Sequence, residues 1–265
     1  VRNSRNNWVN STKSRNPDGS YDCLPPKSTA KNILTVGAVN DIPSGYSKPS
    51  DVAMTSFSSW GPTDDGRIKP DIVANGRSLK SCGTDNPSDY DRKSGTSMSA
   101  PTASGSMLLL QEHYENTYNQ PMRAASLKGL VIHTADEAGP DAGPDYEHGW
   151  GLLNTASAIK HITNASGGDF IREETLQNQQ TYTFTVNASK SNPLSATLSW
   201  HDPAGTPPSP QVDPSTKMLV NDLDLRIRRK NSNQVYKPYV MDPANPDSAA
   251  TKGDNTRDNV EQVFI

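Results

Sequence analysis

The sequence predicts an α/β domain followed by an antiparallel β-sandwich. Up to about Ile162, short continuous apolar runs alternate with helical patterns, whereas beyond it apolar and polar residues alternate with a period of two. Segments rich in Pro, Asn and Asp separate the later runs, as in sandwiches and barrels. A chain of 265 residues has room for two modest domains, and we expect the linker between them at Asn164–Gly168.

Two apolar runs predict the buried strands of a parallel sheet. Residues 1–32 are rich in Asn, Ser, Pro and Gly, which favour turns, and they predict a long loop. Asn32–Val39 then forms a continuous run rich in branched apolar residues, and Asp71–Ala74 forms a second one. Strands that are covered on both faces have this continuous character rather than an alternating one.

Two helices are expected after these strands. From Ser97 to about Glu115, small and apolar residues fall near one face, and we expect Pro101 in the first turn, where its missing N–H costs nothing. Ser126–Ala135 predicts a second helix with Ser126 as its N-cap.

The second half of the chain predicts an incomplete sandwich. Val263–Ile265 is an alternating apolar run with no turn signal after it, so we expect the sequence to be a fragment of a longer precursor. The runs that predict strands are residues 181–186, 194–200, 223–227 and 235–240.

Composition excludes some classes of function. The chain has 26 basic and 29 acidic side chains, and no Lys/Arg cluster marks it as a nucleic-acid binder. No apolar stretch approaches the roughly 18 to 20 residues that span a bilayer, so no membrane span is expected. Cys23 and Cys82 are compatible with an extracellular disulfide and equally with two free buried thiols.

Gly95–Pro101, which reads G-T-S-M-S-A-P, is the segment most informative about chemistry. A nucleophilic serine needs exposure, a nearby N–H for the developing oxyanion, and small neighbours that admit a substrate backbone. Ser97 at a helix start satisfies these needs, because its hydroxyl lies at the positive end of the helix dipole. The same residues also form an ordinary N-cap, so this reasoning alone makes Ser97 only a candidate.

This segment is similar to the nucleophile motif G-T-S-M-[AS]-[ST]-P of the subtilisin-like serine peptidases. Ser99-Ala100 is its one departure, and Asn75 stands where the family usually has Pro in A-P-G. The resemblance covers about residues 1–160 and implies that residues 1–163 are the C-terminal part of a subtilisin-like parallel-sheet domain. The other matching stretches, in the family's order, are Ala30–Ala38, Ser56–Pro62, Arg67–Ile72 and Gly149–Gly151.

The resemblance implies a secreted or extracellular serine endopeptidase that hydrolyses peptide bonds through an acyl-enzyme on Ser97. Its partners would be protein or peptide substrates, which are expected to add a strand beside the site. Asn3 aligns with the family's oxyanion donor, and Arg2 departs from the Gly that usually precedes it. We expect a monomer.

The resemblance also implies that the Asp and His of the catalytic triad precede Val1. Without a base to take its proton, Ser97 in this fragment should be a poor nucleophile. None of the histidines stands in the family's H-G-T context; they are His113, His133, His148, His161 and His201.

The segments that resemble the jelly-roll β-sandwich following the catalytic unit of proprotein convertases are Thr197–Asp202, Leu219–Leu225, Gly253–Asn255 and Asp258–Glu261. The resemblance implies that residues 169–265 are such a domain without its last strands. Asp222 and Asp224, expected on one face of a strand, are candidate ligands for a structural Ca²⁺, since carboxylates at sheet ends are typical calcium ligands. Alternating Asp residues are also typical of a solvated face, and that alternative stays open.

Other classes of function fit less well. Ser97 is followed two residues later by Ser99 and not by Gly, so the G-x-S-x-G elbow of esterases fails. Ser28–Lys31 matches the S-x-x-K of β-lactamases by chance and lacks a K-T-G partner. The serious alternative is a catalytically inactive scaffold or binding module derived from a subtilase.

Overall fold

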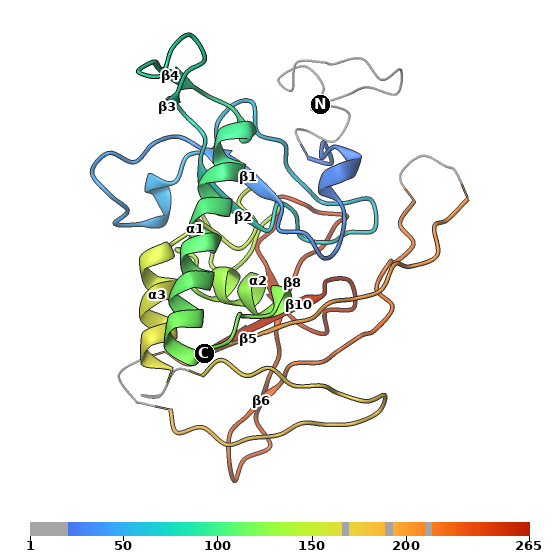
Figure 1. The fold of residues 1–265 in the computed structure, drawn as a ribbon. Helices are drawn as coiled ribbons and strands as arrows, with labels where there is room; N and C mark the ends of the chain where they lie inside the picture. The colour runs from blue at the N-terminus through green and yellow to red at the C-terminus, as the bar shows by residue number, and fades with distance from the viewer. Residues whose placement is uncertain (1–20, 166–169, 189–192, 210–213) are drawn as a thin grey trace.

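The computed structural model describes residues 21–165, 170–188, 193–209 and 214–265. Helices and short strands alternate in its first part, whereas most of the second part is irregular chain with a few short antiparallel strands (Figure 1). In chain order the strands are β1 Val36–Val39, β2 Ile72–Asn75, β3 Leu79–Cys82, β4 Tyr90–Lys93, β5 Ser195–Ser199, β6 Ile227–Arg228, β7 Val235–Tyr236, β8 Tyr239–Val240, β9 Thr251–Lys252 and β10 Val260–Phe264. The helices are the 3-10 turns η1 Pro26–Ser28 and η2 Pro49–Asp51 and the α-helices α1 Thr96–Tyr118, α2 Ala124–His133 and α3 Thr155–Asn164.

β1 and β2 form the parallel pair that their apolar character predicts. Val36 lies opposite Ile72, and the register continues to Val39 opposite Asn75. Both strands are buried along most of their length, and α1 packs against both. Their carboxyl ends lie at the same edge, which is where α/β folds place ligands.

The helices α1 and α2 lie where the sequence predicts them, but their ends differ from the predicted ends. Pro101 lies in the second turn of α1, because the helix begins at Thr96 with Gly95 as N-cap. Ser126 lies inside α2, whose N-cap is Arg123, and its hydroxyl donates to Glu173 at 2.6 Å instead of capping. We did not predict α3, although Asn154 caps it by accepting from the Ser157 N–H at 2.8 Å.

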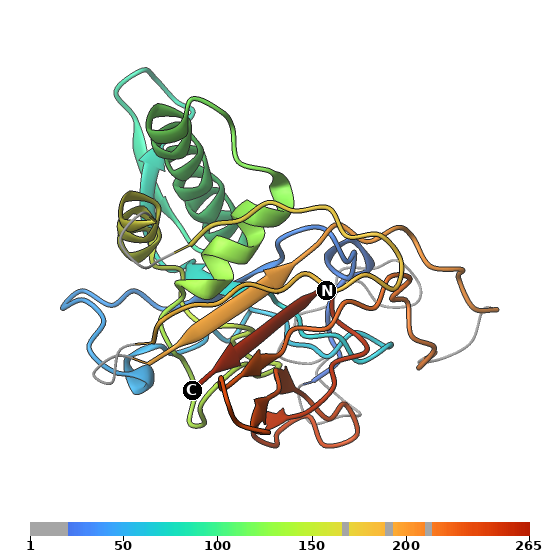
Figure 2. The same cartoon turned by 90° about the horizontal axis from the view of Figure 1, so that it is seen from below.

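β5 and β10 form the longest ladder of the second half. They pair antiparallel, with Val263 opposite Ala196, and β5 packs against α2 (Figure 2). Residues 181–186 have no ladder, and of residues 223–227 only Ile227 pairs, in β6. Within the described ranges only two-stranded ladders occur in this half, so a jelly roll is not confirmed and stays a prediction.

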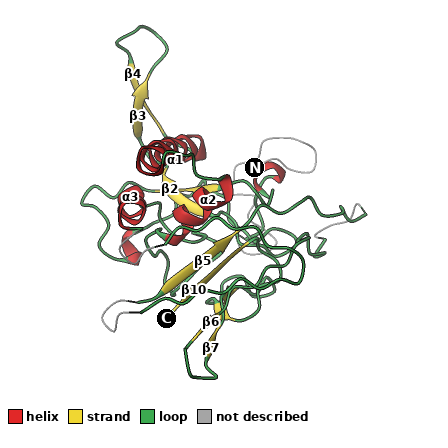
Figure 3. Ribbon diagram, turned by 60° about the horizontal axis from the view of Figure 1, so that its bottom comes forward, coloured by secondary structure: helices red, strands yellow, loops and turns green. Residues whose placement is uncertain are grey.

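One hydrophobic core draws residues from both sides of the predicted linker. Ile72, Leu110 and Val131 in the first half belong to the same buried cluster as Tyr239 and Val260 in the second. The β3–β4 hairpin, by contrast, projects from the body and is largely exposed (Figure 3). In the part of the chain that is described, no helix combines the length and apolar character that crossing a membrane requires.

Candidate active site

The backbone around Gly76 and Gly95 holds the start of α1 at the carboxyl end of the parallel strands. Gly76 N–H donates to the Val39 carbonyl at 3.0 Å, and Gly95 N–H donates to the Gly76 carbonyl at 2.8 Å. A Cβ on Gly76 would lie 2.6 Å from the Ala38 Cβ and 2.9 Å from the Gly95 oxygen. Only glycine allows this close approach, so the β3–β4 hairpin leaves and rejoins the body at a fixed point just before Ser97.

Ser97 lies in the first turn of α1 with an exposed side chain, as the sequence predicts. Gly95 has φ 155°, a conformation that side chains rarely adopt, and its carbonyl accepts the N–H groups of Met98 at 2.9 Å and Ser99 at 3.4 Å. The N–H of Ser97 has no intrahelical acceptor, because the helix begins one residue before it. A donor and the positive helix end therefore lie beside the hydroxyl.

Pro101 removes one backbone hydrogen bond from the second turn of α1, the one that the carbonyl of Ser97 would accept. In an α-helix, the carbonyl of residue 97 accepts from the N–H of residue 101, and proline has none. Ser99, which is fully buried, keeps the first turn in place by donating its hydroxyl to the Thr96 carbonyl at 3.0 Å.

Asn75, which stands where the family usually has Pro in A-P-G, forms side-chain hydrogen bonds in the turn. Its side-chain oxygen accepts the Arg77 N–H at 2.8 Å, and its amide donates to Asp41 at 2.9 Å. These bonds shape the turn that follows β2, so the chain reaches Gly76 without the proline.

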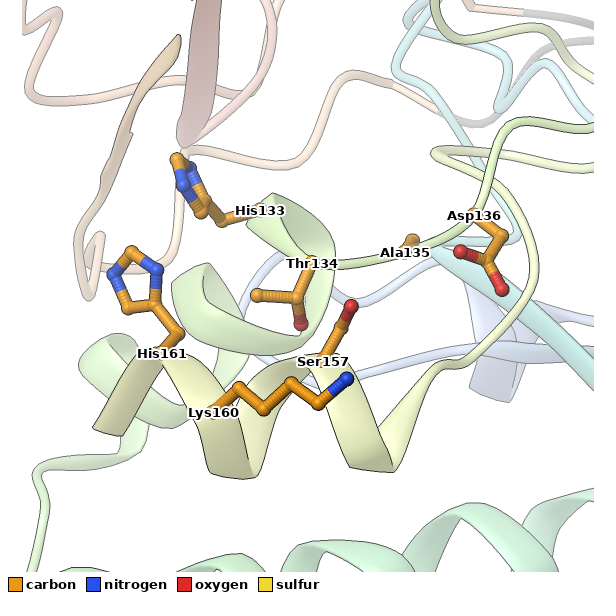
Figure 4. A pocket seen from close by; sticks show the side chains of 7 residues that line it. All are labelled: His133, Thr134, Ala135, Asp136, Ser157, Lys160 and His161. Atoms are coloured by element: carbon orange, nitrogen blue, oxygen red, sulfur yellow. The ribbon is translucent and has the colours of Figure 1, made fainter. Parts of the chain in front are cut away.

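The contacts of the histidines that the structure describes are with residues other than Ser97. His113 lies on α1 about 24 Å along the helix from Ser97, at 1.5 Å per residue, and contacts Thr163. His133 contacts Thr197 and stacks edge-on with His161 in the lining of a surface pocket (Figure 4), while His148 contacts Asp145. His201 is exposed and follows β5. The second candidate site residue, Asn3, lies outside the described residues.

A buried cluster of charged side chains lies where the chain enters β2. Asp71 is 3% exposed, and it binds Lys69 at 2.5 Å and Lys128 at 2.9 Å. Burial by itself raises the pKa of a carboxyl, but Lys128 and Lys69 outweigh it and hold the pKa of Asp71 below its ordinary value. Burial lowers the pKa of Lys69 to about 8, although Asp71 opposes the change.

Sequence reasoning noticed Lys69 and Asp71 only as part of the matching stretch Arg67–Ile72 and missed Lys128 altogether. Lys128 follows Leu127 and precedes Leu130 and Val131 on α2, so it is a charged residue on an apolar helix. Lysines are almost never buried without a partner, so the position itself is a signal for a buried carboxylate nearby.

A second buried ion pair fastens the C-terminal half to the first half. Lys31 pairs with Asp202, which is 0% exposed, and donates to the Pro203 carbonyl at 2.6 Å. Asn32 binds the backbone of Asp202 in both directions, at 2.8 and 3.0 Å. Asp258 adds a further link by accepting the Ile68 N–H at 2.8 Å.

One of the two predicted calcium ligands, Asp224, pairs with an arginine. Asp222 and Asp224 are in irregular chain before β6 and not on a strand. Arg226 binds Asp224 at 2.6 Å and also binds Asp254. Because the guanidinium already neutralises these carboxylates, and no three acidic, His or Cys side chains are grouped for a metal within the described residues, this arrangement does not fit Ca²⁺. Calcium stays a prediction from the sequence.

Glu261, on β10, faces the same arginine from the interior. It is 0% exposed, its Oε2 accepts the Leu225 N–H at 2.5 Å, and its Oε1 has no hydrogen-bond partner. Arg226 lies 3.7 Å away. Burial raises the pKa of Glu261 to about 7, although the Leu225 N–H and Arg226 oppose it.

The two cysteines do not pair. Cys23 is buried and accepts the Trp60 N–H at 3.2 Å through its sulfur, whereas Cys82 is exposed on β3. Of the two alternatives left open by the sequence, the disulfide is not formed, and only one of the thiols is buried.

A comparison with known proteins finds similarity in the part of the chain that carries the motifs around Ser97. The family model of the subtilase family matches residues 6–151, which is more than half of the chain. C5a peptidase of Streptococcus pyogenes serotype M3 is 43% identical over 97 residues, which cover 37% of this chain and 8% of the relative. The protein tagA of Dictyostelium discoideum, a "Serine protease/ABC transporter B family protein", is 28% identical over 211 residues, which cover 67% of this chain and 12% of the relative.

Solved protease structures show partial similarity. The CspB protease of Clostridium perfringens gives a TM-score of 0.47 at 28% identity, covering 54% of this chain and 30% of that one. The patellamide maturation protease PatA gives 0.42 at 24% identity, covering 55% and 48%. The chain thus spans about a tenth of the curated relatives named here and less than half of these solved chains.

Proposed function

Because this chain belongs to the subtilase family, we propose that it carries the nucleophile of a serine endopeptidase, with Ser97 as the attacking residue. The observation that carries the proposal is the position of Ser97, exposed in the first turn of α1 at the carboxyl end of β1 and β2. Its own N–H, without an acceptor in the helix, lies beside the hydroxyl as an oxyanion donor.

The proposed chemistry is acyl transfer. Ser97 Oγ attacks the scissile carbonyl, its proton passes to a base, and the amine leaves with that proton to give an acyl-enzyme that water hydrolyses. The Ser97 N–H, and in our proposal the Asn3 amide, stabilise the tetrahedral oxyanion. Each histidine described here lies elsewhere, so we propose that the base and its carboxylate partner come from outside these 265 residues.

The surroundings of Ser97 support a polypeptide substrate. Gly95 and Ala100 place no bulky side chain beside the hydroxyl, and the β3–β4 hairpin stands next to it with exposed strands. We propose protein or peptide substrates in extended conformation, and a secreted or cell-surface protein that acts as a monomer. The C5a peptidases of Streptococcus pyogenes are consistent with such substrates.

Labelling with a fluorophosphonate, which reacts only with activated serines, tests the proposal. The probe is added to this chain alone and to the parent polypeptide that includes the sequence before Val1. We expect strong labelling of the parent at Ser97, mapped by peptide mass spectrometry, none in its Ser97→Ala variant, and little labelling of the chain alone. A folded parent that is not labelled at Ser97 would instead support the inactive scaffold.

A further inference from the structure

The two faces of the β3–β4 hairpin carry different charges. Residues at alternate positions of a strand share a face, and so do residues that lie opposite each other in the ladder. Asp91 and Lys93 share one face, where they form an ion pair at 3.7 Å, so this face has no net charge. The register places Lys80 opposite Arg92 on the other face, together with Tyr90. The two strands contribute no acidic residue to this second face, which we call the cationic face.

Neither cation of this face is paired with an acid in the part of the chain that the structure describes. The Lys80 ammonium lies over the Tyr90 ring, 5.0 Å from its centroid. Arg92 donates one guanidinium N–H to the Ser78 carbonyl at 2.8 Å, which leaves its other donors for a ligand. Like charges directly opposite each other destabilise a ladder, so folding alone gives no reason to place two cations here.

The carboxylates at the tip of the hairpin have other partners. Asp89 accepts the Asp85 N–H at 3.3 Å, and Asp85 accepts from the Thr84 hydroxyl at 3.4 Å. The remaining acid of the hairpin, Asp91, lies on the opposite face. The cationic face is therefore open to an external anion, and Tyr90 on this face is 58% exposed.

The cationic face lies within reach of a polypeptide bound at Ser97. The hairpin stands at the start of α1 (Figure 3), and the Ser78 N–H donates to the Ser94 hydroxyl at 2.8 Å across its base. Arg92 precedes Ser97 by five positions, which span at most about 18 Å of chain. An extended substrate advances about 3.3 Å per residue, so its side chains roughly three to five positions from the scissile bond can meet this face.

We propose that Lys80 and Arg92 bind acidic side chains of the polypeptide substrate, roughly three to five residues from the scissile bond. The inference rests on the proposed function of Ser97 and adds a substrate preference to it. Charge complementarity identifies the ligand, because guanidinium and ammonium groups bind carboxylates through charge-assisted hydrogen bonds. Two exposed cations also attract an acidic segment before contact and raise its association rate. Tyr90 holds the Lys80 ammonium near Arg92 through a cation–π contact.

Cleavage of matched peptides by the parent polypeptide tests this preference. The peptides are built on a bond that the parent cleaves in casein, and each pair differs only in carrying Glu or Gln at these positions, on one side of the bond or the other. We expect kcat/KM to be about three- to tenfold higher for the Glu peptide on one side, and less so at high salt, because the charges are exposed.

Variants on the two faces of the hairpin show which residues cause the preference. Lys80→Gln with Arg92→Gln should bring the Glu-to-Gln ratio of kcat/KM to about one and leave cleavage of the Gln peptide unchanged. Lys93→Gln, which removes a lysine from the opposite face, is the matched control and should keep the ratio. Lys80→Glu with Arg92→Glu should reverse the preference toward a Lys peptide, a gain that unfolding cannot produce.

A binding assay separates this inference from the proposed function. Fluorescence anisotropy with the Ser97→Ala parent compares a labelled Glu-rich peptide with its Gln counterpart without cleavage, and we expect tighter binding of the Glu peptide. Equal kcat/KM values or equal affinities for the two peptides would overturn the inference. So would a preference that survives in the folded Lys80→Gln, Arg92→Gln variant or that Lys93→Gln abolishes equally. A parent that binds the Glu peptide preferentially but cleaves nothing would overturn the proposed function and leave the acidic-peptide site standing.

Discussion

The Gly95 N–H donates to the Gly76 carbonyl at 2.8 Å, and this single bond closes the base of the β3–β4 hairpin two residues before Ser97. Gly76 in turn binds the Val39 carbonyl at the end of β1. The position of Ser97 is thus set by the parallel strand pair through two adjacent backbone contacts, neither of which uses a side chain.

Gly76→Ala should therefore displace Ser97 and destabilise the chain. The added Cβ meets the Ala38 Cβ at 2.6 Å and the Gly95 oxygen at 2.9 Å, and overpacking of this kind costs about 1–3 kcal/mol of stability. Urea unfolding of the chain measures the cost. Gly105→Ala is the control: no atom lies within 4 Å of its Cβ, and it should stabilise α1 by about 0.5–1 kcal/mol. Equal effects of the two variants would contradict the account.

Breaking the Lys31–Asp202 pair should be far more costly than breaking a surface pair. Asp202→Asn leaves the ammonium of Lys31 buried without its counter-charge, and such losses cost about 3–5 kcal/mol. Asp91→Asn removes an exposed pair with Lys93 at 3.7 Å and should cost about 0–1 kcal/mol. Thermal unfolding compares them, and similar Tm values for both variants would show that the two halves are not joined through this contact.

The sequence predicted the first half of the fold better than the second, and the reason is physical. The residues of β1, β2 and α1 form continuous patterns from which burial can be predicted. These three elements therefore lie where they are expected. The strands after residue 162 depend on neighbours to pair with, and alternation in residues 181–186 does not by itself produce a ladder.

The residues of the candidate site also divide into those that the sequence predicts and those that it does not. The exposed position of Ser97 at the start of a helix could be predicted because its motif is local. The pairs Lys31–Asp202 and Lys128–Asp71 join residues far apart in the chain, and spacing alone cannot reveal them. Sequence reasoning also placed Pro101 one turn too early, because the helix start is fixed by Gly95 and not by the proline.

Glu261 should make the chain less stable as pH rises. Its pKa is raised to about 7 by burial, against an ordinary value of 4.5, so the folded state holds a proton that the unfolded state releases between these values. Stability should fall across this window and then level off. Glu261→Gln stays neutral, and its advantage over the parent should grow from near zero at pH 4 to about 3 kcal/mol at pH 8.

Urea unfolding at a series of pH values measures this difference. Glu112→Gln, an exposed acid on α1, should show no such growth. Arg226, Asp224 and Asp254 face Glu261, so the test is repeated at high salt, where the exposed charges are screened but burial is unchanged. A difference that does not vary with pH would contradict the buried, protonated Glu261.

Calcium should not stabilise the loop that holds Asp222 and Asp224. Arg226 already supplies the positive charge for Asp224 and Asp254, so a divalent cation would have to displace it. We expect millimolar Ca²⁺ to leave the Tm of the chelator-treated chain unchanged, as in an Asp224→Asn variant. A rise in Tm with Ca²⁺ that the variant abolishes would show that the sequence-based calcium site is real.

Hydrolysis of unfolded casein by the parent polypeptide tests the central claim most directly. The account predicts measurable cleavage that falls by at least about 10⁴-fold in Ser97→Ala, since the attacking oxygen is lost, while the variant keeps its fold and its substrate affinity. Cleavage that continues unchanged in Ser97→Ala, or a complete absence of cleavage by a correctly folded parent, would contradict Ser97 as the nucleophile of a peptidase.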